Sequence, residues 1–227
     1  MRWKFILGLL TTCAVLMSMS YTMLIPFLPM YLIQDLGVVK ADVDMWSGAI
    51  FAITFLVSGI MAPIWGALAD KKSRKLMALR AGFCLAITYF LGGLVTNPWE
   101  LLGVRFIQGL SAGLWPALLA IISVESPKLK LGFCMGVMQG GMTAGGVLGP
   151  LFGGLLADQF GMRMAFFIAA AALFLITLAL LFFVKEEPRK PDPNAKPVKI
   201  WDFSLCKIPA VKRMLICAGV VQLTILM

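Results

Sequence analysis

Residues 66–80 read GALADKKSRKLMALR and separate two long apolar segments. This stretch contains five cations: Lys71, Lys72, Arg74, Lys75 and Arg80. The chain around it is strongly apolar, since 60% of its 227 residues are hydrophobic and 14% are charged. A water-soluble domain of this length has no core large enough for so many apolar side chains. The composition therefore predicts an integral membrane protein, in which the basic stretch forms a short loop between two spans.

Six apolar segments are long enough to cross about 30 Å of hydrocarbon as helices. They cover approximately residues 5–33, 45–69, 76–96, 99–123, 132–157 and 163–184. The sequence thus predicts an all-α membrane protein with a six-helix transmembrane bundle over residues 1–184. Residues 185–210 are rich in proline and charge and predict a cytoplasmic linker. Residues 211–227 are apolar but short, which indicates a truncated seventh transmembrane helix.

Lysine and arginine are distributed unevenly among the loops. The N-terminus, every second loop and the segment after residue 184 hold seventeen of them, whereas the intervening loops hold two. Because cytoplasmic loops carry the positive excess, we expect a multi-pass protein of the cell membrane with a cytoplasmic N-terminus. The cations lie beside spans without interleaved aromatic residues, so we expect no nucleic-acid binding.

The sequence lacks the residues of several common active sites. It contains no histidine, its five cysteines show no CxxC spacing, and it has no phosphate-binding loop. We therefore expect no enzyme activity, no metal site and no bound cofactor.

The stretch GALADKKSRK at 66–75 has a counterpart, GLLADQFGMR, at 154–163. Gly66 matches Gly154 and Asp70 matches Asp158, at the ends of the second and fifth segments. If spans one to three and spans four to six are copies of one unit, the two copies have opposite orientations in the membrane, because each contains an odd number of spans. Inverted repeats of this kind are found in secondary transporters. The sequence predicts two inverted three-helix repeats, with chance similarity among common residues as the alternative.

Three motifs resemble those of the major facilitator superfamily, in its drug:proton antiporter branch. GALADKKSRK resembles the family's loop between the second and third spans, with Ser73 in place of the expected glycine. Residues 105–109, RFIQG, resemble its fourth-span motif R-x-x-Q-G, and the run GPLFGG at 149–154 resembles its antiporter motif. The resemblance covers about residues 1–205. It implies export of lipophilic drugs by alternating access, driven by protons. The implied partners are the lipid bilayer, a small lipophilic substrate, protons and a second six-helix half absent from this chain.

The resemblance also implies roles for particular residues. The loop that controls which side of the carrier is open comprises Gly66, Asp70, Lys71, Arg74 and Lys75. The resemblance places Arg105 in the central cavity, with a part in proton coupling or substrate response, and Gln108 lies one turn on and shares its face. The helix at the interface between the two halves carries Gly141, Gly145, Gly149, Pro150 and Gly153.

Spacing supports parts of this picture and leaves alternatives open. Ser58, Ala62, Gly66 and Asp70 recur every four residues and so form one ridge of a helix, as do the four fifth-span glycines. The loop cations also fit a purely topological role, and Arg105 also fits snorkelling to the nearby membrane surface. The glycines also fit close packing within one half.

Proton coupling requires a carboxyl group, and no Asp or Glu lies in the middle of a predicted span. Asp35 and Glu100, at the outer ends, are the nearest candidates, with a plain interfacial role as the alternative. For substrate contacts we expect Tyr21, Met138 and Met142, because methionine and aromatic side chains suit adaptable apolar sites. Pro26 and Pro29 should bend the first helix toward such a cavity.

Two other functions remain open at this point. The chain fits a porter of a sugar or other metabolite from the same superfamily, although the Gly-Pro motif of the fifth segment argues against it. It also fits a truncated membrane protein that transports nothing.

Overall fold

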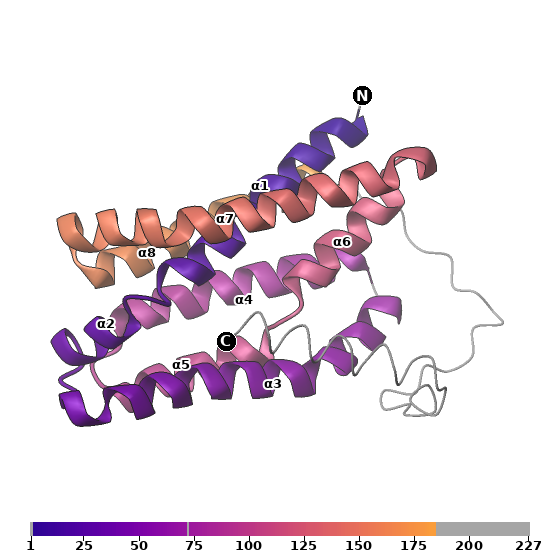
Figure 1. Cartoon of the computed structure of the whole chain (residues 1–227). Helices are drawn as coiled ribbons and strands as arrows, with labels where there is room; N and C mark the ends of the chain where they lie inside the picture. The colour runs from indigo at the N-terminus through magenta and orange to yellow at the C-terminus, as the bar shows by residue number, and fades with distance from the viewer. Residues whose placement is uncertain (1, 72, 185–227) are drawn as a thin grey trace, which may run out of the picture. The chain divides into compact units, whose positions relative to one another are not determined.

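The computed structural model describes residues 2–71 and 73–184, and the predicted linker at 185–210 and seventh helix at 211–227 lie outside this part of the chain. All regular elements of the described part are helices (Figure 1). They are α1 (Arg2–Met23), α2 (Leu28–Gln34), α3 (Val43–Lys71), α4 (Arg74–Leu94), α5 (Pro98–Leu110), α6 (Leu114–Glu125), α7 (Leu131–Phe160) and α8 (Met162–Phe183), with short 3-10 turns at Lys40–Asp42 and Lys128–Lys130.

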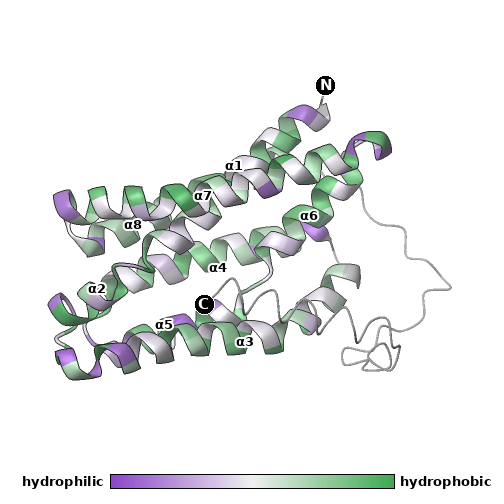
Figure 2. Cartoon of the chain, in the orientation of Figure 1, coloured by the Kyte–Doolittle hydropathy of each residue, from purple (hydrophilic) through white to green (hydrophobic). Residues whose placement is uncertain are grey.

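Six segments of the described residues are long and apolar enough to cross a membrane. They are Trp3–Met23, Lys40–Ala69, Arg74–Leu94, Pro98–Glu125, Lys128–Phe160 and Met162–Phe183. Hydrophilic residues gather mainly near the ends of the helices, while apolar residues run along their lengths (Figure 2). This arrangement confirms the predicted all-α fold with six membrane-spanning segments.

Two of the predicted spans are broken rather than continuous. In the first span α1 ends at Met23 and α2 begins at Leu28, with Pro26 in the break and Pro29 in the first turn of α2. A proline has no N–H to donate, so its place at a helix start removes no helical hydrogen bond. The predicted bend is therefore a complete interruption.

The fourth span, predicted as one helix over 99–123, is interrupted between Leu110 and Leu114. Gly113 adopts a φ of 116°, which favours glycine over any residue with a side chain. Pro116 follows in the first turn of α6. The expectation of a continuous helix was wrong, because Gly113 leaves the right-handed helical conformation and Pro116 has no N–H to donate to the carbonyl of Ala112.

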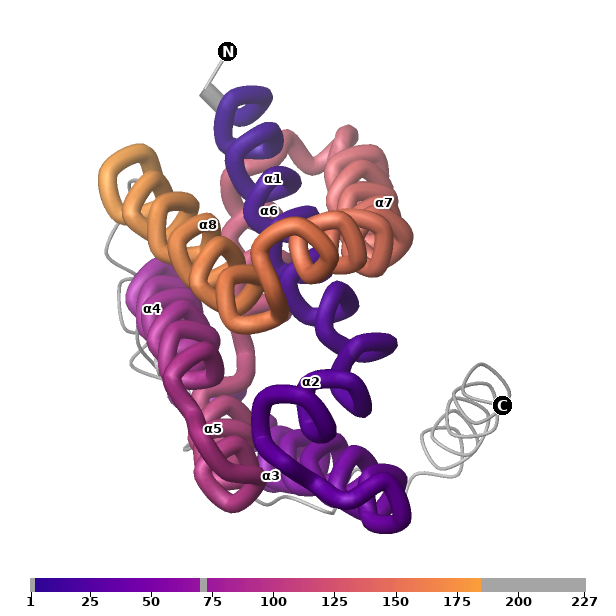
Figure 3. The backbone as a smooth tube through the Cα atoms, turned by 90° about the vertical axis from the view of Figure 1, so that its left-hand side faces the viewer, coloured from indigo at the N-terminus to yellow at the C-terminus, as the bar shows by residue number. Residues whose placement is uncertain are grey.

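The helices pack in symmetric pairs (Figures 1 and 3). α1 lies along α7, α3 along α5 and α4 along α8, while α8 also contacts α1, and α4 also contacts α5 and α6. An inverted repeat relates spans one, two and three to spans four, five and six. Under this exchange the contact of α1 with α7 corresponds to that of α5 with α3. The contact of α1 with α8 likewise corresponds to that of α4 with α5 and α6, which form the fourth span. Gly66 lies 23 residues after Val43, which starts α3, and Gly154 lies 23 residues after Leu131, which starts α7. Both observations support the predicted inverted repeat.

Two clusters of apolar side chains fill the bundle. One lies toward the end where α1 begins and includes Leu10, Leu118 and Met138, which are all fully buried. The other lies toward the opposite end and includes Tyr31 and Phe166. We call the end of the bundle where α1 begins the N-terminal end, and the opposite end the Asp35 end.

Candidate functional site

Arg105 and Gln108 form a buried polar pair on α5. The Arg105 side chain donates from Nη1 to Oε1 of Gln108 over 2.8 Å. Only 6% of Arg105 and 7% of Gln108 are exposed, because residues three apart share the helix face that turns into the bundle. Arg105 therefore points inward, and the alternative that it snorkels to the membrane surface does not describe this structure.

The pair lines a narrow pocket between three helices. The other lining residues are Thr88, Tyr89 and Gly92 of α4, Leu101 and Val104 of α5, and Phe166 of α8. These side chains pack too closely to leave room for a water molecule, whereas sites for drug-sized ligands usually measure about 300–1,000 Å³. The described residues thus contribute a polar wall rather than a complete binding cavity.

Close packing of α3 against α5 holds this wall in place. A Cβ atom added to Gly109 would lie 2.8 Å from the carbonyl oxygen of Thr54, so a larger residue would push the helices apart. Thr54 also donates from Oγ1 to the carbonyl of Ile50 at 2.9 Å and, at 3.4 Å, to that of Arg105. The backbone at Arg105 is therefore fixed against α3.

Tyrosines from other helices border the same region. Tyr89 is almost fully buried and donates its hydroxyl proton to the carbonyl of Ser20 on α1 over 2.9 Å. Tyr21, the next residue along α1, is half-buried and packs edge-to-face on Phe55 of α3, with ring centroids 6.3 Å apart. Tyr21 thus remains partly accessible beside the polar wall.

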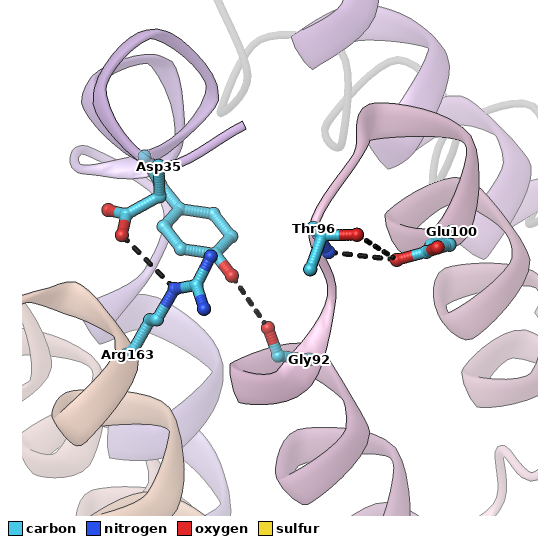
Figure 4. A network of polar contacts seen from close by, with 6 residues as sticks. Asp35, Gly92, Thr96, Glu100 and Arg163 are labelled. Carbon is cyan, nitrogen blue, oxygen red and sulfur yellow. Dashed lines mark hydrogen bonds and ion pairs between the residues drawn. The ribbon is translucent and has the colours of Figure 1, made fainter. Parts of the chain in front are cut away.

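The two candidate carboxylates lie at the Asp35 end, away from Arg105. Arg163 donates from Nε to Oδ1 of Asp35 over 3.2 Å (Figure 4). Glu100 accepts hydrogen bonds from the backbone N–H and the hydroxyl of Thr96, at 2.8 and 3.2 Å (Figure 4). Neither carboxylate lines the Arg105 pocket, so the structure does not bring Asp35 together with Arg105 and Gln108.

The basic loop consists of a helix end followed at once by a helix start. α3 ends at Lys71, and Ser73 caps α4 by accepting a hydrogen bond from Leu76 N at 3.0 Å. Ser73 has a φ of −64°, so this turn needs no glycine. Asp70 belongs to α3, and Arg74 is the first residue of α4. For Asp70 and Lys71 the structure describes the helical backbone but not the side chains.

Two members of the predicted loop, Gly66 and Lys75, lie on the flanking helices α3 and α4. Lys75 donates from Nζ to the carbonyl of Leu181 near the end of α8, over 2.6 Å. Gly66 is exposed, and a Cβ atom there would meet no atom within 4 Å. The ridge that includes Ala62 and Gly66 is therefore uncovered by the described residues.

The fifth-span glycines pack against α1, within the bundle. A Cβ atom on Gly141 would lie 2.6 Å from the Thr11 side chain, and one on Gly153 would lie 2.6 Å from the Met23 carbonyl oxygen. At Gly145 and Gly149 it would overlap the Val15 carbonyl oxygen and the Thr22 hydroxyl. These contacts fit the alternative of close packing within one half. Pro150 lies inside α7, which continues through it.

The predicted substrate residues on α7 differ in accessibility. Met138 is fully buried in the N-terminal apolar cluster, so it packs the core and offers no surface to a ligand in this state. Met142, one turn further along, is half-buried. The prediction of Met138 as a contact residue is therefore corrected on grounds of burial.

Sequence reasoning missed Trp65 and Arg80. The Arg80 guanidinium carbon lies 3.4 Å from the Trp65 ring centroid, and the same side chain donates to the carbonyl of Ala112 over 3.0 Å. The sequence grouped Arg80 with the loop cations. A signal was present, because Arg80 falls inside the apolar segment predicted at 76–96, six residues after the start of α4.

Comparison with known proteins places these features in context. A family model described as Major Facilitator Superfamily matches residues 10–226. The chain is 42% identical over 186 residues to the multidrug resistance protein MdtG of Citrobacter koseri, and 40% identical over 187 residues to that of Yersinia enterocolitica. Each match covers 82% of this chain but only 46% and 45% of those proteins. The chain thus spans about half the length of the curated relatives it matches.

Solved structures show the same fold at lower identity. The POT family transporter PepTSo matches with a TM-score of 0.70 and 14% identity, over 83% of this chain and 40% of that one. A bacterial homologue of the human lysosomal transporter Spinster, in an inward-facing and unoccupied conformation, matches with a TM-score of 0.69 and 23% identity, over 86% of this chain and 46% of that one.

Proposed function

Because this chain belongs to the major facilitator superfamily, we propose that it is the N-terminal half of a proton-coupled transporter that exports lipophilic drugs. The observation that carries the proposal is the buried Arg105–Gln108 pair inside a membrane-spanning segment. A guanidinium group in hydrocarbon costs several kcal/mol or more, so such residues usually serve a transport pathway. The drug class comes from relatives that are named multidrug resistance proteins.

The two-half arrangement is part of the proposal. The side chains around Arg105 leave no room for a drug among themselves, so a complete cavity needs a second wall. We propose a second six-helix half as that wall, with Tyr21 and Met142 among the substrate contacts on this side. Alternating access then follows when the two halves rock against each other around the site.

We propose that the loop formed by Gly66, Asp70, Lys71, Arg74 and Lys75 controls which side is open. The uncovered surface at Gly66 supports this role, since a residue without a side chain permits close approach of another helix. The loop's contacts would then change between the inward-open and outward-open states.

We further propose that the N-terminal end of the bundle faces the cytoplasm in the cell membrane. Trp3 at this end lies near two cations, with Lys4 Nζ 5.9 Å and Lys130 Nζ 5.4 Å from its ring centroid. An aromatic ring among lysines suits the headgroup region of an anionic leaflet.

Export is tested in cells that express the complete gene product and are loaded with a fluorescent lipophilic cation. We expect dye efflux that stops when an uncoupler abolishes the proton gradient. The Arg105→Ala variant should lose efflux, whereas Lys128→Gln, which removes an exposed cation at the N-terminal end, should retain it. Absent efflux, or efflux that persists with the uncoupler, would contradict the proposal.

A further inference from the structure

The break in the fourth span leaves backbone carbonyl groups without helical partners. α5 ends at Leu110 and α6 begins at Leu114, so the carbonyls of Leu110 and Ala112 accept no i+4 helical hydrogen bond. Within a membrane-spanning segment such groups need donors from the protein, because lipid supplies none.

Trp65 and Arg80 supply these donors from two other spans. Trp65 of α3 donates from Nε1 to the carbonyl of Leu110 over 2.8 Å. Arg80 of α4 donates from Nη2 to the carbonyl of Ala112 over 3.0 Å. The guanidinium carbon also lies 3.4 Å from the indole centroid, which places the two donors in a cation–π contact with each other.

Charge and shape at the break match this pair. The C-terminal end of a helix carries a partial negative charge, and the Arg80 guanidinium lies beside the C-terminal end of α5. A Cβ atom on Gly113 would lie 3.7 Å from Arg80 Nη2 and 3.9 Å from Trp65 Cβ, so the two side chains enclose the left-handed residue.

The last turn of α5 connects this pair to the polar wall. Gln108 lies two residues before Leu110, whose carbonyl is held by Trp65, and Gln108 accepts the hydrogen bond from Arg105. We propose that Trp65 and Arg80 are positioning residues, which fix the break in the fourth span and thereby the orientation of the Arg105–Gln108 pair. The link to transport rests on the proposed function, whereas the structural role does not.

A labelling experiment tests the positioning role without requiring transport. In the complete gene product with every cysteine replaced by alanine, Gln108→Cys reports on the burial of that position through its reaction rate with a small water-soluble maleimide. We expect Trp65→Phe and Arg80→Met each to raise this rate about tenfold, as the loss of one buried hydrogen bond allows. Arg80→Lys keeps the charge but not the planar donor group, so its labelling rate should fall between those of Arg80→Met and the parent protein.

Two controls match these variants. Trp99→Phe alters an exposed tryptophan, and Lys128→Gln removes an exposed cation, so both should label at the parent rate. Parent rates in Trp65→Phe and in folded Arg80→Met would overturn the inference. If Arg80→Met does not fold, Trp65→Phe decides alone, because it keeps a smaller aromatic side chain and removes the indole N–H donor.

Transport kinetics supply a second readout. If Arg80 acts through Gln108, the Arg80→Met, Gln108→Ala double variant should export no more slowly than Gln108→Ala alone. Additive losses would contradict positioning. An absence of efflux in the parent protein would instead contradict the proposed function, and the labelling rates would still decide the role of Trp65 and Arg80.

Discussion

Arg163, in the first turn of α8, donates to Asp35, the residue that caps the C-terminal end of α2, over 3.2 Å. This pair joins the first and sixth spans at the Asp35 end of the bundle. The Asp35 side chain is 26% exposed and that of Arg163 is 40% exposed, so water screens their attraction.

We predict a weak energetic coupling between these two residues. A double-mutant cycle with Asp35→Asn and Arg163→Gln should give a coupling free energy of about 0.2–1 kcal/mol, as for other exposed pairs. Unfolding midpoints in detergent provide the measurement. A coupling free energy well above this range would indicate a pair that is shielded from water.

A second prediction concerns proton coupling. If Asp35 is the coupling carboxyl, Asp35→Asn should make efflux insensitive to an uncoupler, whereas Arg163→Gln should leave that sensitivity intact. Uncoupler-sensitive efflux in Asp35→Asn would show that Asp35 is not the coupling carboxyl.

Gly149 should be far less tolerant of a methyl group than Gly140 on the same helix. A Cβ atom on Gly149 would overlap the Thr22 hydroxyl of α1, whereas one on Gly140 meets no atom within 4 Å. We expect Gly149→Ala to destabilise the protein by about 1–3 kcal/mol through overpacking. Gly140→Ala should be neutral or stabilising by up to about 1 kcal/mol. Thermal unfolding in detergent measures both variants, and equal effects would show that α1 and α7 are not in close contact.

Gly113 should resist substitution because of its backbone conformation rather than its neighbours. At a φ of 116°, an alanine is strained, and Gly113→Ala should cost about 1–3 kcal/mol of stability. Gly103→Ala is the control, since Gly103 lies inside α5 with no atom within 4 Å of an added Cβ. If both variants unfold at the same temperature, the fourth span is not broken at this position.

Ser73 should act as a helix cap and not as a substitute for a glycine with positive φ. Its side chain accepts a hydrogen bond from Leu76 N, and its φ is −64°. Ser73→Ala should therefore cost about 1 kcal/mol, and Ser73→Gly only a few tenths. Unfolding of the two variants in detergent separates these outcomes. A gain in stability for Ser73→Gly would mean that the turn prefers a left-handed residue.

Long, continuous signals in the sequence predicted the fold well. The six apolar segments correspond to six spans, because a bilayer requires each span to be long, apolar and internally hydrogen-bonded. The similarity of 66–75 to 154–163 pointed to a repeat, and Gly66 and Gly154 lie at equivalent positions of α3 and α7. The motif resemblance likewise identified the superfamily that the family model matches.

Helix interruptions were harder to predict, since they depend on a few residues and on neighbours from other spans. Pro26 and Pro29 predicted a bend where the first break lies, but the second break needs Gly113 with Pro116 and is completed by Trp65 and Arg80. No pattern within one span shows that donors from two others converge there.

Sequence alone thus determined which segments cross the membrane, their repeat and their superfamily, because hydrophobic length and local motifs are properties of single segments. Tertiary structure decided which face of each helix meets which neighbour. In the structure the α7 glycines pack against α1, and Arg105 is buried and bonded to Gln108. Arg80, which the sequence grouped with the basic loop, lies at the break in the fourth span. These outcomes depend on contacts between residues far apart in the chain, where the need to pair buried polar groups selects one arrangement.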